Sequence, residues 1–332
     1  MNQTTLPTES KPGAQRRSLE ALRSWEALDY GMFIHFGMST FDGQELSPGD
    51  SPATRFAPDA LDVDQWVSVA RDAGMKYAVL TTKHVAGFCL WPTKQTDYHV
   101  GHSSCKTDVV EAFVRACEKR GIKPGLYYCS WDNHNRFGSL NWSDTTNLAF
   151  AYTTAAYREF QARQIHELLT QYGPIVETWI DIPHLLGREG RIVQYQQIAE
   201  LQPDTVIMLN HGFGDGTQVK INDAWPTDIM AIERWLPSSH RGYNKWHQIS
   251  DSKAAPQPYY IPGEVCDPIG YEWFHQDNDA PRSVMELVGM RSICRARGAN
   301  LLLNVPPDRS GRIPQRHIDA LMKTRTQFEK LC

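Results

Sequence analysis

Two hydrophobic patterns follow each other repeatedly along this chain. In residues 62–73 the apolar positions recur at helical spacing, Gly74 then ends the pattern, and the apolar run Tyr77–Thr82 follows. The same order is repeated by residues 106–120, which end at Gly121, and by the run that begins directly afterwards. A helix that ends at glycine and precedes a short buried strand is typical of a parallel sheet with crossover helices.

The repeated unit predicts the architecture of the whole chain. Further helices are predicted near 149–172, 190–201, 282–297 and 314–330. Strands are predicted at Met32–Phe36, Tyr77–Thr82, Lys123–Cys129, Ile175–Asp181, Thr205–Leu209, Ile229–Glu233, Pro262–Cys266 and Asn300–Val305. Eight such strands in roughly 300 residues predict an α/β fold, a (β/α)8 TIM-like barrel. An open doubly wound sheet is the alternative, but the loop Gly212–Gly216 lacks the G-x-G-x-x-G spacing and no helix opens after it.

The chain divides into a short leader and one domain. Residues 1–18 are polar and contain Pro, Thr and Ser, which predicts a mobile leader. Residues 19–332 contain no linker or low-complexity insert and are predicted to form a single barrel domain. The last predicted helix lies at the end of the sequence, which leaves no room for an appended β-sandwich.

Composition removes several classes of function. The 332 residues are 41% hydrophobic and 22% charged, as in a globular protein. There are 34 Lys and Arg against 38 Asp and Glu, and a net charge of −4 does not favour nucleic-acid binding. No apolar run approaches the roughly 18 residues of a membrane span, and the N-terminus shows no secretory pattern. The seven Cys are odd in number and unlike a disulfide framework, so a reducing cytoplasm is the expected location.

Polar and aromatic residues gather where the predicted strands end. In a (β/α)8 barrel the active site lies at the C-terminal ends of the strands. The residues placed there are His35, His84, Tyr127, Trp179, Asp181, Glu233 and Glu264. Two imidazoles, three carboxylates and aromatic faces suit an enzyme that acts on a polar, ring-shaped substrate. Each also has a structural interpretation: Asp181 could cap a helix, and Glu233 could pair with Arg234.

A zinc site is an alternative centre. His99, His102 and Cys105 have zinc-like spacing, and they would serve a zinc hydrolase. No second well-spaced His or Cys pair follows them, so we predict no metal at this position and no cofactor elsewhere.

Longer motifs at the strand ends resemble one known family. The segments Tyr30–Gly37, Ala73–His84, Gly125–Tyr128, Glu177–Asp181 and Asn300–Asp308 resemble the α-L-fucosidases of glycoside hydrolase family 29. The resemblance extends from about residue 25 to 330, and its motifs together are specific.

The resemblance implies a chemistry and a set of roles. It implies a (β/α)8 catalytic domain that releases terminal L-fucose from fucosylated oligosaccharides or glycoconjugates through a covalent glycosyl-enzyme intermediate. Asp181 corresponds to the nucleophile, and His35, His84, Tyr127 and Trp179 correspond to sugar-binding positions. For the acid/base we prefer Glu233, with Glu264 as the rival that otherwise tunes the site or binds a hydroxyl.

Three departures from the family pattern keep other functions open. The family's His-His-Asp-Gly-Phe run has Val85 as its second residue here, and Ile182 stands where a glycine follows the nucleophile. No C-terminal β-sandwich like the one common in the family is expected in this chain. A carbohydrate-binding barrel without catalysis, or a related glycosidase with another sugar specificity, is the alternative.

Overall fold

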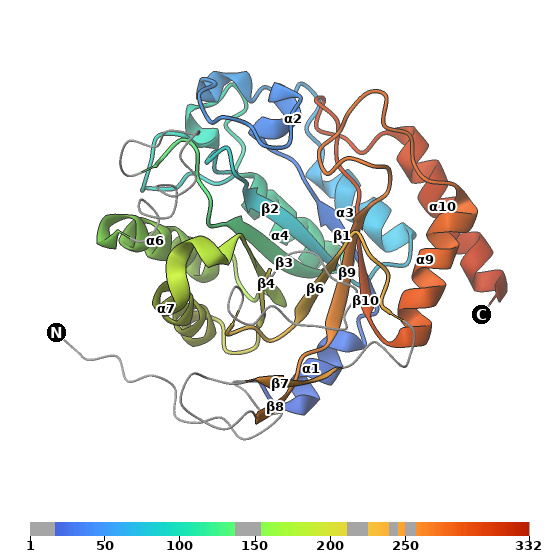
Figure 1. Ribbon diagram of the computed structural model, residues 1–332. Helices are drawn as coiled ribbons and strands as arrows, with labels where there is room; N and C mark the ends of the chain where they lie inside the picture. Colours follow the sequence, from blue (N-terminus) through green and yellow to red (C-terminus); the bar gives the residue numbers. More distant parts are fainter. Residues whose placement is uncertain (1–16, 137–153, 211–224, 239–244, 250–256, 332) are drawn as a thin grey trace.

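The protein forms a closed barrel of parallel strands surrounded by helices (Figure 1). The computed structural model describes residues 17–136, 154–210, 225–238, 245–249 and 257–331. Its helices are α1 (Leu19–Glu26), α2 (Met38–Asp42), α3 (Val63–Asp72), α4 (Val109–Arg120), α6 (Ala155–Gln171), α7 (Gly187–Leu201), α9 (Val284–Arg297) and α10 (Gln315–Leu331). Three short 3₁₀ helices are η1 (Ala53–Arg55), η2 (Val100–His102) and η3 (Pro183–Leu186).

Eight strands make the main sheet. They are β1 (Tyr30–Ile34), β2 (Tyr77–Lys83), β3 (Lys123–Cys129), β4 (Glu177–Asp181), β5 (Val206–Leu209), β6 (Met230–Glu233), β9 (Gly263–Pro268) and β10 (Asn300–Asn304). Their order is β5-β4-β3-β2-β1-β10-β9-β6. The two edges meet through a parallel bridge between Met208 and Ile229, where Asp228 N also donates to Ile207 O (2.8 Å). The (β/α)8 barrel prediction is therefore confirmed, with each strand boundary within two residues of its predicted position.

The repeated sequence pattern forms the elements that it predicted. Asp62 and Asp108 accept hydrogen bonds from the first turns of α3 and α4, and these caps start the helices. Gly121 ends α4 and Gly298 ends α9 in the left-handed conformation, which glycine adopts without steric cost. Of the predicted helix 149–172, residues 149–153 lie outside the described part, as does the loop Gly212–Gly216.

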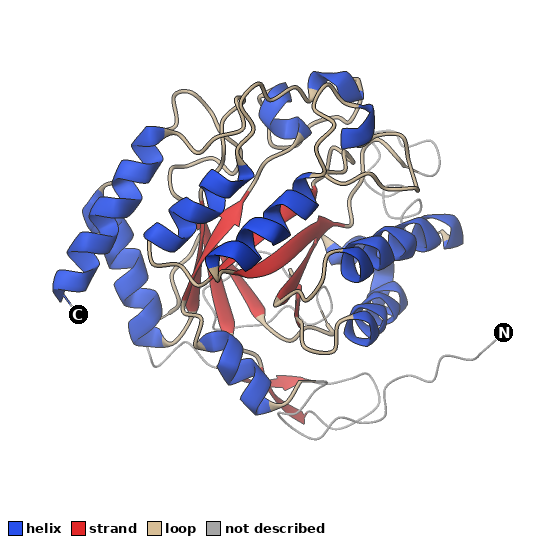
Figure 2. Cartoon of the chain, turned by 180° about the vertical axis from the view of Figure 1, so that it is seen from behind, coloured by secondary structure: helices blue, strands red, loops and turns tan. Residues whose placement is uncertain are grey.

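Alternation along the strands separates two apolar cores. On β1, Met32 and Ile34 face the helices, whereas Phe33 faces the barrel interior. The helices cover the outer face of the sheet, as seen from behind in Figure 2. Cys89, Cys117, Cys129 and Cys294 are buried and free.

Several elements were not predicted from the pattern, among them one helix and one hairpin. Helix α1 covers the N-terminal end of the barrel, where Leu22 and Trp25 join the interior core. A separate hairpin of β7 (Trp246–Ile249) and β8 (Gln257–Tyr260) lies beside α1, and Tyr260 and Lys245 bind Glu26 there (Figure 1).

The predicted leader lies almost wholly outside the described residues. Its last two residues are described: Arg17 donates to Gln202 O (3.0 Å), and Ser18 caps α1. Within the described ranges, no helix combines the length and the apolar character that a membrane span requires. All strands in these ranges belong to the barrel sheet or to the β7–β8 hairpin, so they contain no β-sandwich.

Candidate active site

A pocket lies at the C-terminal ends of the barrel strands. Its lining residues are Phe33, His35, Glu45, His84, Tyr127, Trp179, Asp181, Asn210, Glu233, Cys266 and Trp273. Six of the seven residues predicted from strand ends are in this set, and only Glu264 is not. The rule that strand ends converge therefore locates the site.

Asp181 is the last residue of β4 and is held by three donors. The Tyr127 hydroxyl donates to Oδ2 (2.6 Å), while Asn210 Nδ2 (2.8 Å) and the backbone N of Ile182 (3.0 Å) donate to Oδ1. Burial raises the pKa of Asp181, and these hydrogen bonds to the charged form oppose that rise. Asp181 does not cap the following helix η3, whose N-cap residue is Ile182.

The backbone turns sharply after each of two pocket carboxylates. Ile182 has φ 51° and Arg234 has φ 58°, both in the left-handed region that is costly for such side chains. The first follows Asp181 and the second follows Glu233, the last residue of β6. Strain at both positions accompanies the carboxylates that point into the pocket.

Glu233 is a buried pocket carboxyl with a raised pKa. Burial raises its pKa to about 7, and the nearby charge of Asp181 contributes to the rise. The ion pair considered with Arg234 is not the main contact of that guanidinium, which lies 5.2 Å from the ring centres of Tyr271 and of Trp273.

One side-chain amide connects the two carboxylates. Asn210 Nδ2 lies 2.8 Å from Asp181 Oδ1 and 3.4 Å from Glu233 Oε2. Those two oxygens are consequently at most about 6.2 Å apart, the sum of the two distances. Asn210 directly follows the predicted strand Thr205–Leu209, a position at which the strand-end rule places a candidate residue.

The two histidines are neutral hydrogen-bonding groups. His35 Nδ1 lies 2.8 Å from Asn304 Oδ1, which also accepts the His35 backbone N–H, so Nδ1 is the donor and Nε2 keeps a lone pair. Burial lowers the pKa of His84 to about 3, and that of His35 well below its usual range. The His84 ring donates to the backbone carbonyl of Glu45, and its buried Nδ1 has no partner among the described residues. Each histidine thus offers an acceptor nitrogen to a ligand.

Aromatic rings form the walls of the pocket. Tyr127 stacks on Trp179 with ring centres 5.4 Å apart, and His84 stacks on Tyr127 at 5.7 Å. Trp273 lies 5.0 Å from the His35 ring. Trp273 was not predicted, because it lies in the loop beyond β9 and no strand pattern marks it.

Glu45 is a third pocket carboxyl, which the sequence pattern did not reveal. It is half-buried, and burial raises its pKa, while the positive charge of Arg234 opposes the rise. It follows β1 by eleven residues, beyond helix α2, so it has no place in the strand-end rule. Only its backbone contact with His84 and its position in the lining identify it.

The prediction that Glu264 lies at the rim of the pocket is wrong. Strand β9 continues to Pro268, two residues past its predicted end, and pairs Ala231 with Glu264 rather than with a residue nearer the rim. Glu264 is fully buried below the pocket, where Tyr77 Oη (2.5 Å) and Trp179 Nε1 (3.1 Å) donate to it. Its hydrogen bond with Trp179 connects it to the pocket lining.

Val85 likewise lies outside the lining. Its side chain is buried in the interior core, and its carbonyl accepts a hydrogen bond from Asn133 N (2.8 Å). The position at which the family carries a second His therefore has a packing role in this chain.

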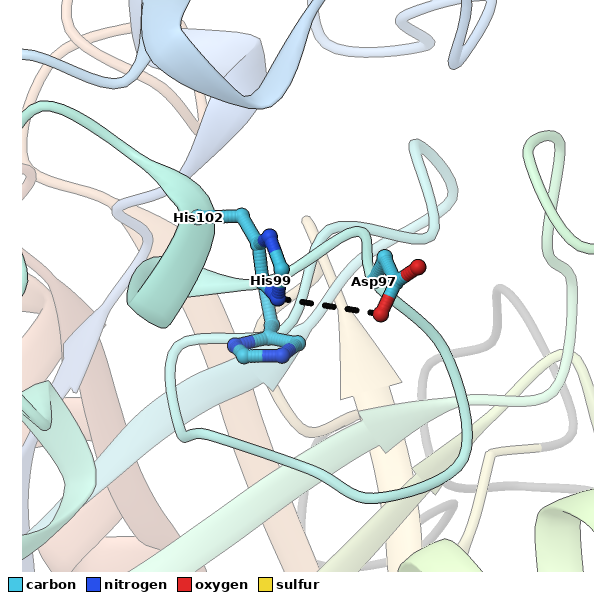
Figure 3. Close-up of side chains that lie close together, drawn as sticks. All are labelled: Asp97, His99 and His102. Carbon is cyan, nitrogen blue, oxygen red and sulfur yellow. Dashed lines mark ion pairs between the residues drawn. The ribbon is translucent and has the colours of Figure 1, made fainter.

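The zinc-like motif forms a separate cluster (Figure 3). Possible ligand atoms of Asp97, His99 and His102 lie within 4.8 Å of one another, whereas Cys105 is not among them. His99 Nδ1 accepts the Gly101 N–H (3.0 Å), which places its proton on Nε2 and leaves no lone pair free for a metal. None of the three lines the pocket. The cluster does not support the zinc-hydrolase alternative.

Comparison with known proteins identifies the family. The sequence model of the family described as "Alpha-L-fucosidase" matches residues 50–326. The chain belongs to the α-L-fucosidase family. "Alpha-L-fucosidase 1" of Arabidopsis thaliana is 31% identical over 315 residues, which cover 90% of this chain and 57% of that protein. The chain spans little more than half the length of this relative, and the same holds for a rice protein named "Putative alpha-L-fucosidase 1", with 30% identity and 56% coverage.

Solved structures of fucosidases share the fold. A putative α-L-fucosidase from Bacteroides thetaiotaomicron has a TM-score of 0.75 and 30% identity, and the match covers 97% of this chain and 69% of that chain. The unliganded α-L-fucosidase AlfC from Lactobacillus casei has a TM-score of 0.70 at 23% identity, covering 94% of this chain and 98% of that one. The second likeness concerns the fold alone.

Proposed function

We propose that this protein is a retaining α-L-fucosidase that hydrolyses terminal L-fucose from fucosylated glycans. The observation that carries the proposal is the pair Asp181 and Glu233, joined through Asn210. In retaining glycosidases the two carboxyl groups are about 5–5.5 Å apart, and in inverting ones about 6.5–9.5 Å. The two bridged oxygens, one from each carboxyl, lie at most about 6.2 Å apart, and this close approach supports the retaining arrangement, in which the carboxylate contacts the sugar directly.

In the first step Asp181 is the nucleophile. Its carboxylate oxygen attacks the anomeric carbon of the fucosyl group and forms an ester bond there. The bond from that carbon to the leaving oxygen breaks, and Glu233 gives its proton to the leaving oxygen. The three hydrogen bonds that Asp181 accepts keep this carboxylate oriented and stabilise its charge.

In the second step Glu233 is the base. Its carboxylate takes a proton from water, the water oxygen bonds to the anomeric carbon, and the ester bond to Asp181 breaks. L-Fucose leaves with its original anomeric configuration. A pKa of about 7 suits Glu233 to both duties, because either form is readily populated at neutral pH.

The remaining lining suits recognition of the sugar. Neutral His35 and His84 accept hydrogen bonds from ring hydroxyls, and the Trp179 and Trp273 faces pack on C–H groups, including the C5 methyl. These roles follow from the proposed chemistry and from the neutral state of both imidazoles.

The test is the release of fucose and the configuration of the first product. We expect hydrolysis of an aryl α-L-fucoside with the α-anomer of L-fucose appearing first in the proton NMR spectrum. Asp181→Ala lowers kcat by roughly 10⁴-fold or more, because the covalent route is lost, and azide restores part of the rate.

Two outcomes would contradict the proposal. A first product with the β-configuration would indicate inversion. Binding of L-fucose with no hydrolysis of any α-L-fucoside would indicate a carbohydrate-binding barrel instead.

A further inference from the structure

A second cavity, the N-terminal cavity, lies at the end of the barrel opposite the candidate active site. It has a volume of about 580 Å³ and lies where β1, β2 and β10 begin, with α1 and α9 at its sides. Five of its lining side chains are cationic, namely Arg23, Lys76, Lys245, Arg291 and Arg295. Among the described residues, its lining has no member in common with the active-site pocket. The two cavities are therefore separate sites.

The N-terminal cavity is positively charged although the whole chain is acidic. Glu26 and Asp29 are its carboxylates, so its lining has a formal charge of +3, against −4 for the chain. The lining also includes Ala27 and Gly298, the C-cap residues of α1 and α9, and each helix end adds roughly half a negative charge. An excess of about +2 remains after both ends are counted. Compensation of helix ends therefore does not account for all five cations.

The ends of the strands fix one side of the cavity. The Asp29 carbonyl accepts the Leu301 N–H (2.9 Å), and the Tyr30 carbonyl accepts the Lys76 N–H (2.9 Å). These hydrogen bonds continue the pairing of β1 with β10 and with β2. Lys76 Nζ also donates to the Ala27 carbonyl (3.1 Å). Asp29 and Lys76 consequently keep their places at the start of neighbouring strands.

Two arginines of α9 are ordered by aromatic rings. The Arg291 guanidinium carbon lies 4.4 Å from the ring centre of Tyr30 and 3.9 Å from that of Phe328. Arg295, one turn further along α9, lies 5.8 Å from the Phe328 ring centre. A guanidinium stays charged at neutral pH, and its planar set of donors matches the oxygens of a phosphoryl group. Side chains that are already ordered lose little entropy when an anion binds.

The lining also indicates the class of ligand. A phosphoryl group carries about −1.5 to −2 at neutral pH, so an excess of two to three positive charges matches one or two such groups. In the described part of the chain, the lining has no aromatic side chain on which a nucleobase could stack. The Asp29 carboxylate accepts hydrogen bonds from hydroxyl groups. The volume is within the usual range for a small-molecule site.

We propose that the N-terminal cavity binds a small phosphorylated polyol, such as a sugar bisphosphate, through Lys76, Arg291 and Arg295. The phosphoryl oxygens accept hydrogen bonds from these cations, and a hydroxyl of the polyol donates to Asp29. This site does not depend on the proposed fucosidase function. A lipid headgroup that consists of a phosphorylated polyol has the same chemistry, and the experiment distinguishes it from a free compound.

The experiment is calorimetric titration of the full chain with glucose 1,6-bisphosphate, and with glucose as the uncharged counterpart. We expect a Kd below about 100 μM for the bisphosphate, which rises with added NaCl because salt screens the charges, and weaker binding of glucose. Arg295→Gln and Lys76→Met each raise the Kd about fivefold to tenfold, because each removes a charged donor. Both side chains are exposed, so the variants keep the thermal stability of the wild type.

Arg115→Gln is the matched control variant. Arg115 is an exposed arginine of α4 that pairs with Glu111, and it is not in the lining of the N-terminal cavity. This variant lowers the net charge of the chain by the same amount as Arg295→Gln, so it tests for attraction by overall charge. We expect its Kd to equal that of the wild type.

Sedimentation with vesicles distinguishes the two sources of the ligand. The vesicles contain phosphatidylcholine with or without phosphatidylinositol 4,5-bisphosphate. Cosedimentation that requires this lipid and is lost in Arg295→Gln would assign the site to a headgroup, whereas binding of the free bisphosphate alone would assign it to a soluble compound.

Three results would overturn the proposal. They are no binding of the bisphosphate or of the lipid by the wild type, the same Kd for Arg295→Gln, Lys76→Met and Arg115→Gln, and tighter binding of ATP than of the bisphosphate. None of these measurements depends on whether the protein hydrolyses fucosides.

Discussion

The two ends of the barrel carry similar carboxyl pairs in opposite environments. Strand β4 contributes to both, because Glu177 and Asp181 are four residues apart and both face the interior. At the C-terminal end Asp181 is joined to Glu233 through Asn210, in a lined pocket. At the N-terminal end Glu177 lies with Glu264, both fully buried. The same residue type thus occurs twice, once where a ligand can reach it and once where it cannot.

The inner pair, Glu177 and Glu264, is enclosed by its neighbours. Trp25 of α1 donates to Glu177 Oε2 (3.1 Å), while Tyr77 and Trp179 donate to Glu264. Burial raises the pKa of Glu264 to about 7 and that of Glu177 well above its usual range. Two buried carboxyls in contact cannot both ionise cheaply, so they share a proton. The comparison indicates that access and hydrogen-bond partners, not residue type, separate a carboxyl that lines the pocket from one that is sealed in the barrel.

The largest expected difference between the two ends is in how strongly kcat/KM depends on the leaving group when a carboxyl is replaced. Glu233→Gln lowers kcat/KM roughly 10²- to 10⁴-fold on a fucosyl disaccharide, whose leaving group needs a proton, and far less on an activated aryl fucoside. In the wild type, kcat/KM falls near pH 7 because Glu233 must be protonated to act as the acid. This alkaline limb of the pH profile disappears in the variant. Steady-state kinetics on both substrates across pH measure this.

The matched variant at the N-terminal end of the barrel is Glu264→Gln. Glu264 lies outside the pocket lining and is hydrogen-bonded to Trp179, so this variant changes kcat/KM by similar factors on both substrates and keeps the alkaline limb of the pH profile. If Glu264→Gln showed the leaving-group dependence and Glu233→Gln did not, the assignment of the two ends would have to be reversed.

The inner pair makes stability depend on pH. The pKa of Glu264 is about 7 in the native state against 4.5 ordinarily, so between these values the unfolded chain loses a proton that the native state keeps. This contribution is fully present below pH 4.5 and is lost as the pH rises through 7, a total change of about 3 kcal/mol. Glu264→Gln removes it, so the free energy of unfolding falls less from pH 5 to pH 7 than in the wild type. Urea unfolding at several pH values measures the difference, and an unchanged slope would contradict the burial of an ionisable pair.

The smallest expected effects come from deleting one hydroxyl at each end. Tyr127→Phe removes a donor to Asp181 and lowers kcat/KM about tenfold, with little loss of stability. Tyr77→Phe removes a donor to Glu264 and lowers the free energy of unfolding by about 1–3 kcal/mol, with kcat/KM nearly unchanged. Kinetics and thermal unfolding of both variants form a cross-check, and equal kinetic losses would show that the two ends are coupled.

Much of the fold and most of the site could be predicted from local pattern. Helical spacing, glycine ends and apolar runs are properties of ten to fifteen neighbouring residues, so they predicted the eight strands and their order of appearance. Because the strands are parallel, His35, His84, Asp181 and Glu233 could be assigned to one rim without knowledge of their contacts.

The part that could not be predicted depends on register between distant strands. The alternation along the strand shows that Glu264 faces the barrel interior, but it does not show how far along the barrel axis Glu264 lies. The pairing of Ala231 with Glu264 places Glu264 below the pocket. The role of Asn210 as a bridge likewise depends on how β4, β5 and β6 are staggered. Glu45 enters the pocket from a loop, where no periodicity exists to mark it.

The sequence by itself therefore determined the barrel, the end that carries the site, and the residue types gathered there, because these follow from short-range periodicity and from parallel strands. The tertiary structure alone decided which carboxyls are partners and which are sealed. Those properties arise from the stagger of the strands and from the α1 helix that closes the opposite end. Glu233 and Glu264 differ in their height along the barrel axis: Glu233 lines the pocket and Glu264 lies below it. The neighbouring residues in the sequence do not determine this height.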